Sequence, residues 1–114
     1  MALVCNFDRL EAISMGEDDF AAEMVRVFLD DSGSQIGIFQ TALEQGDVGA
    51  AMAAVHRMKG AAGNVGAEVF ADACRSLEAL ARQGQTDGLA PQAAELRREL
   101  DRVRETFQEQ MGAL

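Results

Sequence analysis

Residues 48–66 read VGAAMAAVHRMKGAAGNVG, and this stretch decides which kind of fold the chain can form. With about 100° of turn per residue, a helix here gathers its apolar side chains within an arc about 80° wide. An arc of that width is typical of a helix that packs one face against a hydrophobic core. The stretch therefore predicts an amphipathic helix over about 47–64, capped by Asp47, with Asn64 and Gly66 both suited to the left-handed turn that follows. The residues of the predicted core arc are Val48, Ala51, Val55, Met58 and Ala62.

Four further helices are expected, because apolar residues recur at helical spacing between glycine, proline and N-cap signals. In the second of them, Ser32-Gly33-Ser34 separates two apolar stripes and is expected to kink or interrupt the helix. Whether one helix or two form there is left open by the pattern. The stripes contain Phe20, Met24, Val27, Phe28, Ile36, Phe39 and Leu43. The expected helices cover about 7–14, 17–45, 67–83 and 91–111, and the connector 85–90 has room for one helical turn.

The composition agrees with an all-helical domain. The chain has 114 residues, of which 48% are hydrophobic, and it contains one proline. Strong helix formers dominate and β-branched residues are sparse, so strands are poorly supported. Short connections between amphipathic helices favour antiparallel neighbours. We therefore expect a single domain over residues 1–114, an all-α, antiparallel up-down-up-down four-helix bundle with a short extra N-terminal helix.

Charge and cysteine content narrow the function classes. A formal net charge of −9 repels nucleic acid and anionic membranes, so neither is an expected partner. No stretch approaches the roughly 20 apolar residues of a membrane span. Cys5 follows an apolar run too short for a secretory signal, and Cys74 falls in an apolar helical pattern that predicts burial. The expected location is the cytoplasm, with both thiols reduced.

His56 is the only histidine, and it lies on the solvent side of the helix predicted over 47–64. On the helical wheel it falls roughly 120° from the centre of the apolar arc. Glycine inside a helix costs about 0.5–1 kcal/mol relative to alanine, so glycines beside His56 are a destabilising choice. Close approach of another protein to the imidazole explains that choice, and close helix packing within the domain is the alternative. The strip around His56 contains Gly49, Ala53, Lys59, Gly60 and Gly63, with Met52 at its border.

The chemistry suggested by this strip is phosphoryl transfer. Imidazole is available as a neutral nucleophile at cytoplasmic pH, and a ring nitrogen can hold a phosphoryl group as a phosphoramidate. Lys59 lies one turn from His56, where an ammonium favours the negative charge of a phosphoryl group. A solvated surface lysine without such a role is the alternative. Nε2 is expected to be the more accessible nitrogen, which leaves Nδ1 free to donate a hydrogen bond.

Residues 55–67, VHRMKGAAGNVGA, resemble the signature of the histidine-containing phosphotransfer (HPt) domain family. That signature is His-x-x-Lys-Gly, then small residues, then an apolar residue followed by Gly-Ala; Ala61-Ala62 stands where serine is often found. The resemblance implies a monomeric bundle without kinase or ATPase activity. It also implies phosphoryl exchange with receiver domains of response regulators and hybrid histidine kinases. No cofactor is expected on this chain, and Mg²⁺ is expected on the partner receiver.

The resemblance also implies roles for individual residues. His56 would be phosphorylated, Lys59 would stabilise the phosphoryl group, and Gly60 would leave clearance for the receiver. Glu78 stands where the family often has Gln or Glu facing the histidine, although pairing with Arg82 at i+4 is an equally simple role. The arginines expected near the site could complement an acidic receiver surface. The predicted partner-binding residues are Met52, Ala53, Arg57, Gly63, Arg75 and Arg82.

Other functions fit less well. A histidine-kinase dimerisation helix has an acidic residue after its histidine and a proline soon after, whereas here Arg57 follows and the proline is Pro91. A di-metal bundle needs more than one histidine, and no nucleophile–base constellation for a hydrolase is visible. A non-catalytic helical adaptor that binds signalling proteins remains the alternative to phosphotransfer.

Overall fold

The fold is all-α, as the sequence predicts. The computed structural model describes residues 1–112, so the last two residues of the expected domain 1–114 lie outside the described part. Each predicted helix is present with ends within two residues of its expected range, and the connector contains one short 3₁₀ turn. The elements are α1 (Phe7–Ser14), α2 (Asp18–Glu44), α3 (Val48–Val65), α4 (Glu68–Arg82), η1 (Thr86–Gly88) and α5 (Gln92–Met111).

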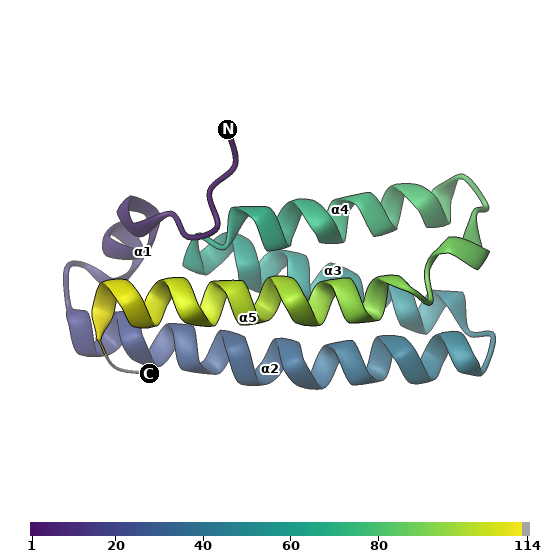
Figure 1. Cartoon of the computed structure of the whole chain (residues 1–114), viewed down its shortest axis with the longest axis horizontal. Coiled ribbons are helices and arrows are strands. Elements are labelled where there is room, and N and C mark those ends of the chain that lie inside the picture. Colours follow the sequence, from purple (N-terminus) through teal and green to yellow (C-terminus); the bar gives the residue numbers. More distant parts are fainter. Residues whose placement is uncertain (113–114) are drawn as a thin grey trace.

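Four long helices form the bundle, and the short α1 lies across one end of it (Figure 1). Helix α2 packs against α3 and α5, and α4 completes the ring through contacts with α3 and α5. Helix α1 contacts α2 and α3. The described residues measure 42 × 25 × 19 Å along their principal axes. Helix α3 is therefore flanked by α2 on one side and by α4 on the other, with one face left to solvent.

Helix α2 runs without interruption through Ser32-Gly33-Ser34. It has 27 residues, and at ~1.5 Å per residue this is about the full length of the bundle. Ser32 is fully buried, so this segment packs into the core rather than forming a break. Burial against neighbouring helices outweighs the weak helix propensity of one glycine and two serines. The expected interruption therefore does not occur.

Two aromatic or apolar residues assigned to the core stripes of α2 lie on the surface instead. Phe20 is 51% exposed and Val27 is 57% exposed, whereas Val25 and Phe28 are buried. On the wheel, positions 20 and 27 fall roughly 120° from the centre of the line of buried residues. The predicted apolar stripe of Phe20, Met24, Val27 and Phe28 therefore does not form one buried face, because Phe20 and Val27 lie on an exposed strip beside the buried line. The buried line contains Ala21, Val25, Phe28, Leu29, Ser32, Ile36, Phe39 and Ala42.

The N-terminal segment is fastened across the turn between α3 and α4. Gly66 ends α3 with φ +81°, and a Cβ there would lie 2.5 Å from the carbonyl oxygen of Asn6. Only glycine fits this approach, and Asn64 stays helical. The Asn6 N–H donates to the Gly66 carbonyl at 2.7 Å, and the Val69 N–H donates to the Leu3 carbonyl at 3.0 Å. This segment satisfies a backbone donor of α4, whose N-cap Ala67 has no side chain able to do so.

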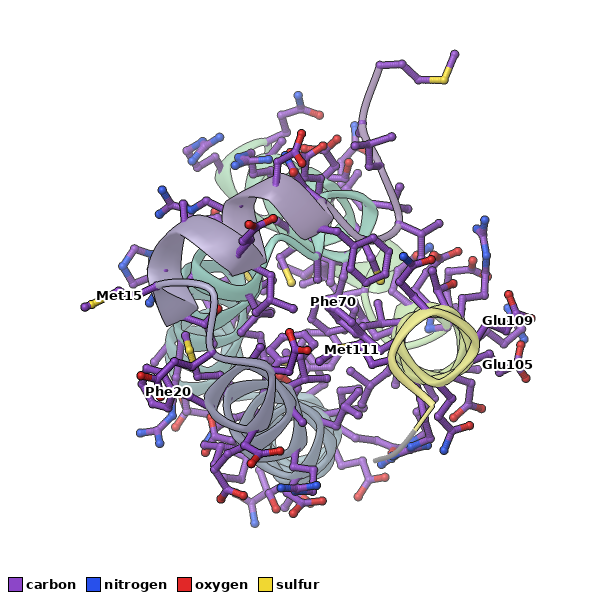
Figure 2. All side chains as sticks on the ribbon, turned by 90° about the vertical axis from the view of Figure 1, so that its left-hand side faces the viewer. Met15, Phe20, Phe70, Glu105, Glu109 and Met111 are labelled. Carbon is purple, nitrogen blue, oxygen red and sulfur yellow. The ribbon has the colours of Figure 1, made fainter. Side chains whose placement is uncertain are left out.

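The core fills the space between the helices and reaches both ends of the bundle. Figure 2 shows Phe70 and Met111 pointing inward, while Glu105 and Glu109 of α5 point outward. Phe28 and Phe70 meet edge to face with centroids 5.6 Å apart. Cys74 is buried as the sequence predicts, and Cys5 is buried too. Both thiols are free, and burial raises the pKa of each to about 12. Among residues 1–112, no helix combines the length and apolar character that a membrane span requires.

Candidate functional site

The two faces of α3 differ as the sequence predicts. Met58 and Val55 on the inner face are fully buried, whereas the His56 side chain is 74% exposed. A Cβ added at Gly60 or Gly63 would meet nothing within 4 Å. Neighbouring helices therefore do not require these glycines, and close packing within the domain does not explain them. An exposed imidazole stands in a strip of small side chains with open space around it.

Glu78 on α4 brings His56 and Lys59 of α3 together. The Lys59 ammonium donates to Glu78 Oε1 at 2.7 Å, and Glu78 Oε2 lies 3.5 Å from His56 Nδ1. The Glu78 side chain is 16% exposed and the Lys59 side chain 27%. The hydrogen bond from Lys59 lowers the pKa of Glu78 below its ordinary value, and the charges of Lys59 and His56 act in the same direction. The carboxylate is thus ionised and beside one ring nitrogen, and within residues 1–112 it is the only polar partner of the imidazole.

The pairing of Glu78 with Arg82, the alternative role considered for this residue, does not occur. Arg82 is the last residue of α4, is exposed, and makes no ion pair within residues 1–112. The other two predicted arginines are already paired with carboxylates. Arg57 binds Asp31 of α2 through two hydrogen bonds of 2.9 and 3.1 Å, and Arg75 pairs with Asp72 one turn away on α4. Their charges are therefore largely offset in this state.

A groove runs along each side of the exposed strip of α3. The α4-side groove borders Gly60 and Gly63 and is also lined by Arg75 and Arg9. The α2-side groove is lined on its other wall by Phe20, Val27 and other residues of α2. Met52 at the border of the strip is half-buried, and Ala53 is exposed.

The sequence did not lead us to place Arg9, Phe20 and Val27 among the residues that line these grooves. A signal for the last two does exist in the sequence. Phe20, Met24, Val27 and Asp31 follow helical spacing at i, i+4, i+7 and i+11, which places them on one strip of α2. Reading that strip separately from the buried line would have predicted an exposed apolar surface. Arg9 carried no signal, because its position depends on how α1 packs against α3.

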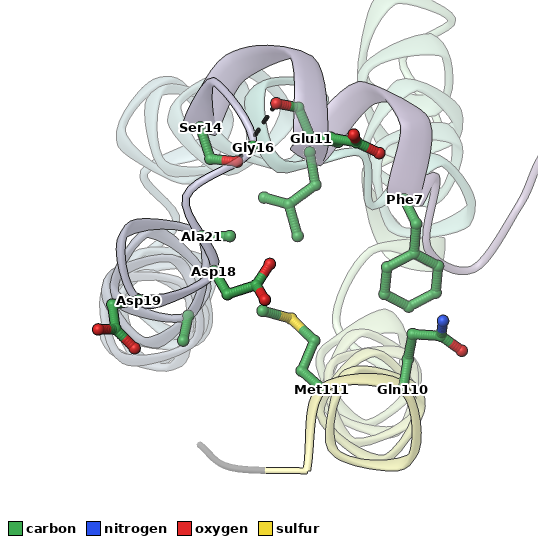
Figure 3. A pocket seen from close by; sticks show the side chains of 11 residues that line it. Phe7, Glu11, Ser14, Gly16, Asp18, Asp19, Ala21, Gln110 and Met111 are labelled. Carbon is green, nitrogen blue, oxygen red and sulfur yellow. Dashed lines mark hydrogen bonds between the residues drawn. The ribbon is translucent and has the colours of Figure 1, made fainter.

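A further pocket at the end of the bundle contains none of the predicted site residues. Figure 3 shows it between α1, the start of α2 and the end of α5, with Phe7, Asp18 and Met111 around it. The Gly16 N–H donates to the Glu11 carbonyl at 3.0 Å beside this pocket. Within residues 1–112 no group of histidine, cysteine and carboxylate side chains is arranged to hold a metal ion. The chemistry-bearing residues gather on α3 and α4 instead.

Comparison with known proteins agrees with this geometry. Residues 23–106 match the family model described as the Hpt domain. Histidine-containing phosphotransfer protein B from Pseudomonas aeruginosa PAO1 is similar in structure, with a TM-score of 0.85 and 26% identity over 98% of this chain and 97% of that one. A putative histidine-containing phosphotransfer protein from rice gives a TM-score of 0.82 and 26% identity over 96% of this chain and 83% of that one.

No curated protein sequence matches the chain. The family match nevertheless spans α3 and α4 completely, together with most of α2 and α5. It therefore includes the histidine, the lysine, the strip glycines and the glutamate that the structure brings together. The chain belongs to the Hpt domain family.

Proposed function

We propose that His56 accepts a phosphoryl group from the phosphorylated aspartate of one receiver domain and passes it to the aspartate of another. The observation that carries the proposal is the 74% exposed imidazole in a strip of glycine and alanine with open space around Gly60 and Gly63. A nucleophile that must meet the active site of a second protein needs such clearance, because the reacting atoms must approach to about 3–3.5 Å. Family membership supports the same reaction class.

In the transfer step, the lone pair of His56 Nε2 attacks phosphorus. The bond from phosphorus to the aspartate oxygen breaks, and that carboxylate recovers its negative charge. Onward transfer is the reverse: the N–P bond breaks, its electron pair stays on Nε2, and a new O–P bond forms on the second aspartate. If Nδ1 keeps its proton throughout, the leaving group is neutral imidazole rather than an imidazolate anion, which would be a far poorer leaving group.

Glu78 is the positioning residue for this chemistry. Its Oε2 lies 3.5 Å from Nδ1, so a proton on Nδ1 has an ionised acceptor beside it. Such a contact fixes the tautomer with the lone pair on Nε2 and stabilises the cationic phosphoimidazole. The distance is long for a hydrogen bond, and we expect it to shorten when the ring gains positive charge, as catalytic contacts commonly do.

Lys59 supplies positive charge to the phosphoryl group. In the structure its ammonium donates a hydrogen bond to one carboxylate oxygen of Glu78. The other oxygen of Glu78 lies beside His56 Nδ1. An ammonium carries three donors, so Lys59 can keep this bond and still donate to a phosphoryl oxygen. The electrostatic gain is larger here than in water, because both Lys59 and Glu78 are mostly buried.

The receiver docks on the strip and on the surfaces beside it. Gly60 and Gly63 provide the clearance, and Phe20 and Val27 offer exposed apolar area on the α2 side. We also assign partner contacts to the residues predicted from the sequence. Among them, Arg57 is held in place by its two hydrogen bonds to Asp31. The other assigned contacts are Met52, Ala53, Arg75 and Arg82.

The partners are receiver domains of response regulators and hybrid histidine kinases. We propose that this chain acts as a cytoplasmic monomer, holds no cofactor of its own, and relies on Mg²⁺ bound by the receiver. In this scheme the chain contributes the nucleophile and its two supporting side chains. The receiver contributes the metal ion and the phosphorylated aspartate.

Phosphotransfer assays test the proposal. The chain is mixed with each phosphorylated receiver domain of the same genome, and acid-labile phosphate on the chain is measured over time. We expect transfer from at least one receiver and complete loss of transfer in His56→Gln, with an unchanged melting temperature because the side chain is exposed. Binding of a receiver without any transfer would favour the adaptor function, and transfer that persists in His56→Gln would contradict the assignment.

A further inference from the structure

We propose that the α4-side groove binds an acidic segment of the receiver domain through Arg9 and thereby helps to select which receivers are served. This inference rests on the proposed function and adds a specificity residue from α1, outside the exposed strip. The groove borders Gly60 and Gly63, so a receiver centred on His56 would extend over it. Arg9, on α1, lines the same groove as Gly60 and Gly63 of the strip.

Arg9 is singled out by its lack of a partner. Of the ten lysines and arginines, seven form ion pairs with carboxylates, and three form none within residues 1–112. Those three are Arg9, Arg82 and Arg97, and of them only Arg9 lines one of the described grooves. An exposed guanidinium without a carboxylate partner is available to an incoming carboxylate as a bidentate donor.

The carboxylates inside the same groove are already occupied. Glu68 accepts hydrogen bonds from the Leu3 N–H at 2.9 Å and from the Asn6 side chain at 2.8 Å, and these bonds lower the pKa of Glu68. Asp72 pairs with Arg75. Glu68 keeps its negative charge, because its partners are neutral donors, but it is turned toward them and forms no ion pair with Arg9. The groove lining holds three cations, Arg9, Lys59 and Arg75, against two carboxylates, Glu68 and Asp72, so its small net positive charge would attract an acidic partner segment.

Neither the pocket at the end of the bundle nor the α2-side groove contains a cation without a carboxylate partner. The end pocket is lined by Glu11, Asp18 and Asp19 without any cation. In the α2-side groove the one arginine, Arg57, is held by Asp31. In a chain with a net charge of −9, an acidic partner is repelled over most of the surface, so a local cation governs where and how it docks.

Arg9 is also held in a defined place. Asn6 caps α1 by accepting from the Arg9 N–H at 3.0 Å, and the Asn6 N–H is bonded to the Gly66 carbonyl at the end of α3. The wall that carries Arg9 is thus fastened to the helix that carries His56. The family match begins at residue 23, so α1 lies outside the matched part, where a residue that selects particular partners need not be shared by the family.

Charge reversal at Arg9 tests this inference. The rate of phosphoryl transfer is measured for wild type, Arg9→Gln and Arg9→Glu against the receiver panel at low and high salt. For a receiver with an acidic segment opposite the groove, we expect kcat/KM to fall by about 10-fold in Arg9→Glu at low salt, and less in Arg9→Gln. The rate at saturating receiver should be unchanged, high salt should narrow the difference, and receivers without that segment should be unaffected.

Arg102→Glu is the matched control, because Arg102 is an exposed arginine of α5 that lines none of the three grooves. At high salt it should leave every transfer rate within about twofold of wild type, since a charge outside the groove is screened there, and at low salt its effect should be much smaller than that of Arg9→Glu. Equal loss in Arg9→Glu and Arg102→Glu would overturn the inference, as would Arg9→Glu rates equal to wild type for every receiver. If wild type accepts phosphate from no receiver, the proposed function itself fails, which is a different outcome.

Discussion

The inner and outer faces of α3 follow opposite rules within the same 18-residue helix. On the inner face, Val55 and Met58 are fully buried and complete the core. On the outer face, Gly60 and Gly63 leave open space and contribute nothing to packing. Selection for stability would place larger helix formers at these outer positions, because interior glycines weaken a helix. Under the proposed function, the outer face is kept open for access to His56 at some cost in stability.

The comparison predicts that substitutions on the two faces separate stability from activity. The largest effect is expected on the inner face. Met58→Ala removes a fully buried side chain and should lower the free energy of unfolding by about 2–5 kcal/mol. Urea denaturation followed by circular dichroism measures this loss.

Met52→Ala is the control for that experiment, because Met52 is on the same helix but only half-buried. Its loss should be about 1 kcal/mol or less, in proportion to the smaller apolar area. Below its melting temperature, Met58→Ala should still transfer phosphate. Equal destabilisation by both substitutions would mean that the two faces are not distinct in their packing.

The second-largest effect is expected on the outer face, where a substitution should lower the transfer rate rather than the stability of the fold. Gly60→Gln places a bulky side chain one turn from His56, in the open space through which the proposed partner would approach. We expect kcat/KM for phosphoryl transfer to fall on the order of 10²-fold, since misplacement of reacting atoms by about 1 Å has that effect. Stopped-flow or quench-flow transfer assays with a phosphorylated receiver measure the change.

Gly37→Ala and Gly60→Ala sharpen this test. Both glycines are helical, and a Cβ at either position meets nothing within 4 Å. Each alanine should raise the free energy of unfolding by about 0.5–1 kcal/mol. Only Gly60→Ala should also slow transfer. A Gly60→Gln variant that transfers at the wild-type rate would show that clearance is not the reason for the glycine.

The smallest effect concerns the carboxylate between the two helices. Ionised Glu78 has a pKa below its ordinary value of 4.5, so its interactions stabilise the fold above that pH and are lost as pH falls through the lower value. The free energy of unfolding of Glu78→Gln should therefore fall less steeply than that of wild type as the pH drops below 4.5. Urea midpoints measured across the acid range test this.

Glu105→Gln serves as the control, because Glu105 points away from the bundle on α5 and pairs with no cation within residues 1–112 (Figure 2). Its urea midpoints should follow wild type throughout. If Glu78→Gln also follows wild type, the bonds to Lys59 and His56 do not contribute to folding stability. A role of Glu78 in transfer would then need its own support from transfer rates.

Much of the fold could be predicted from the sequence because the helices are regular and their ends carry clear signals. Asp47 caps α3 with its side chain as expected, and Gly66 adopts the left-handed conformation. The continuity of α2 could not be predicted, because burial of Ser32 depends on neighbouring helices. The exposed strip that contains Phe20 and Val27, in contrast, has its own helical spacing in the sequence and could have been predicted.

For the site, the exposure of His56 followed from its angle on one helix, which is a local property. The contact of Glu78 with both Lys59 and His56 joins α3 to α4 and depends on their packing. Helical spacing alone therefore could not predict this contact, although the resemblance to the HPt family pointed to Glu78. The ion pairs that offset Arg57 and Arg75 were also not predicted, because carboxylates on nearby turns and helices supply them.

Phosphorus NMR of the chain after transfer from a phosphorylated receiver tests the central claim most directly. The account predicts a single phosphohistidine signal with the phosphoryl group on Nε2 of His56, because Glu78 lies beside Nδ1. The signal should be absent in His56→Gln. A phosphoryl group on Nδ1, or on any other residue, would contradict the account.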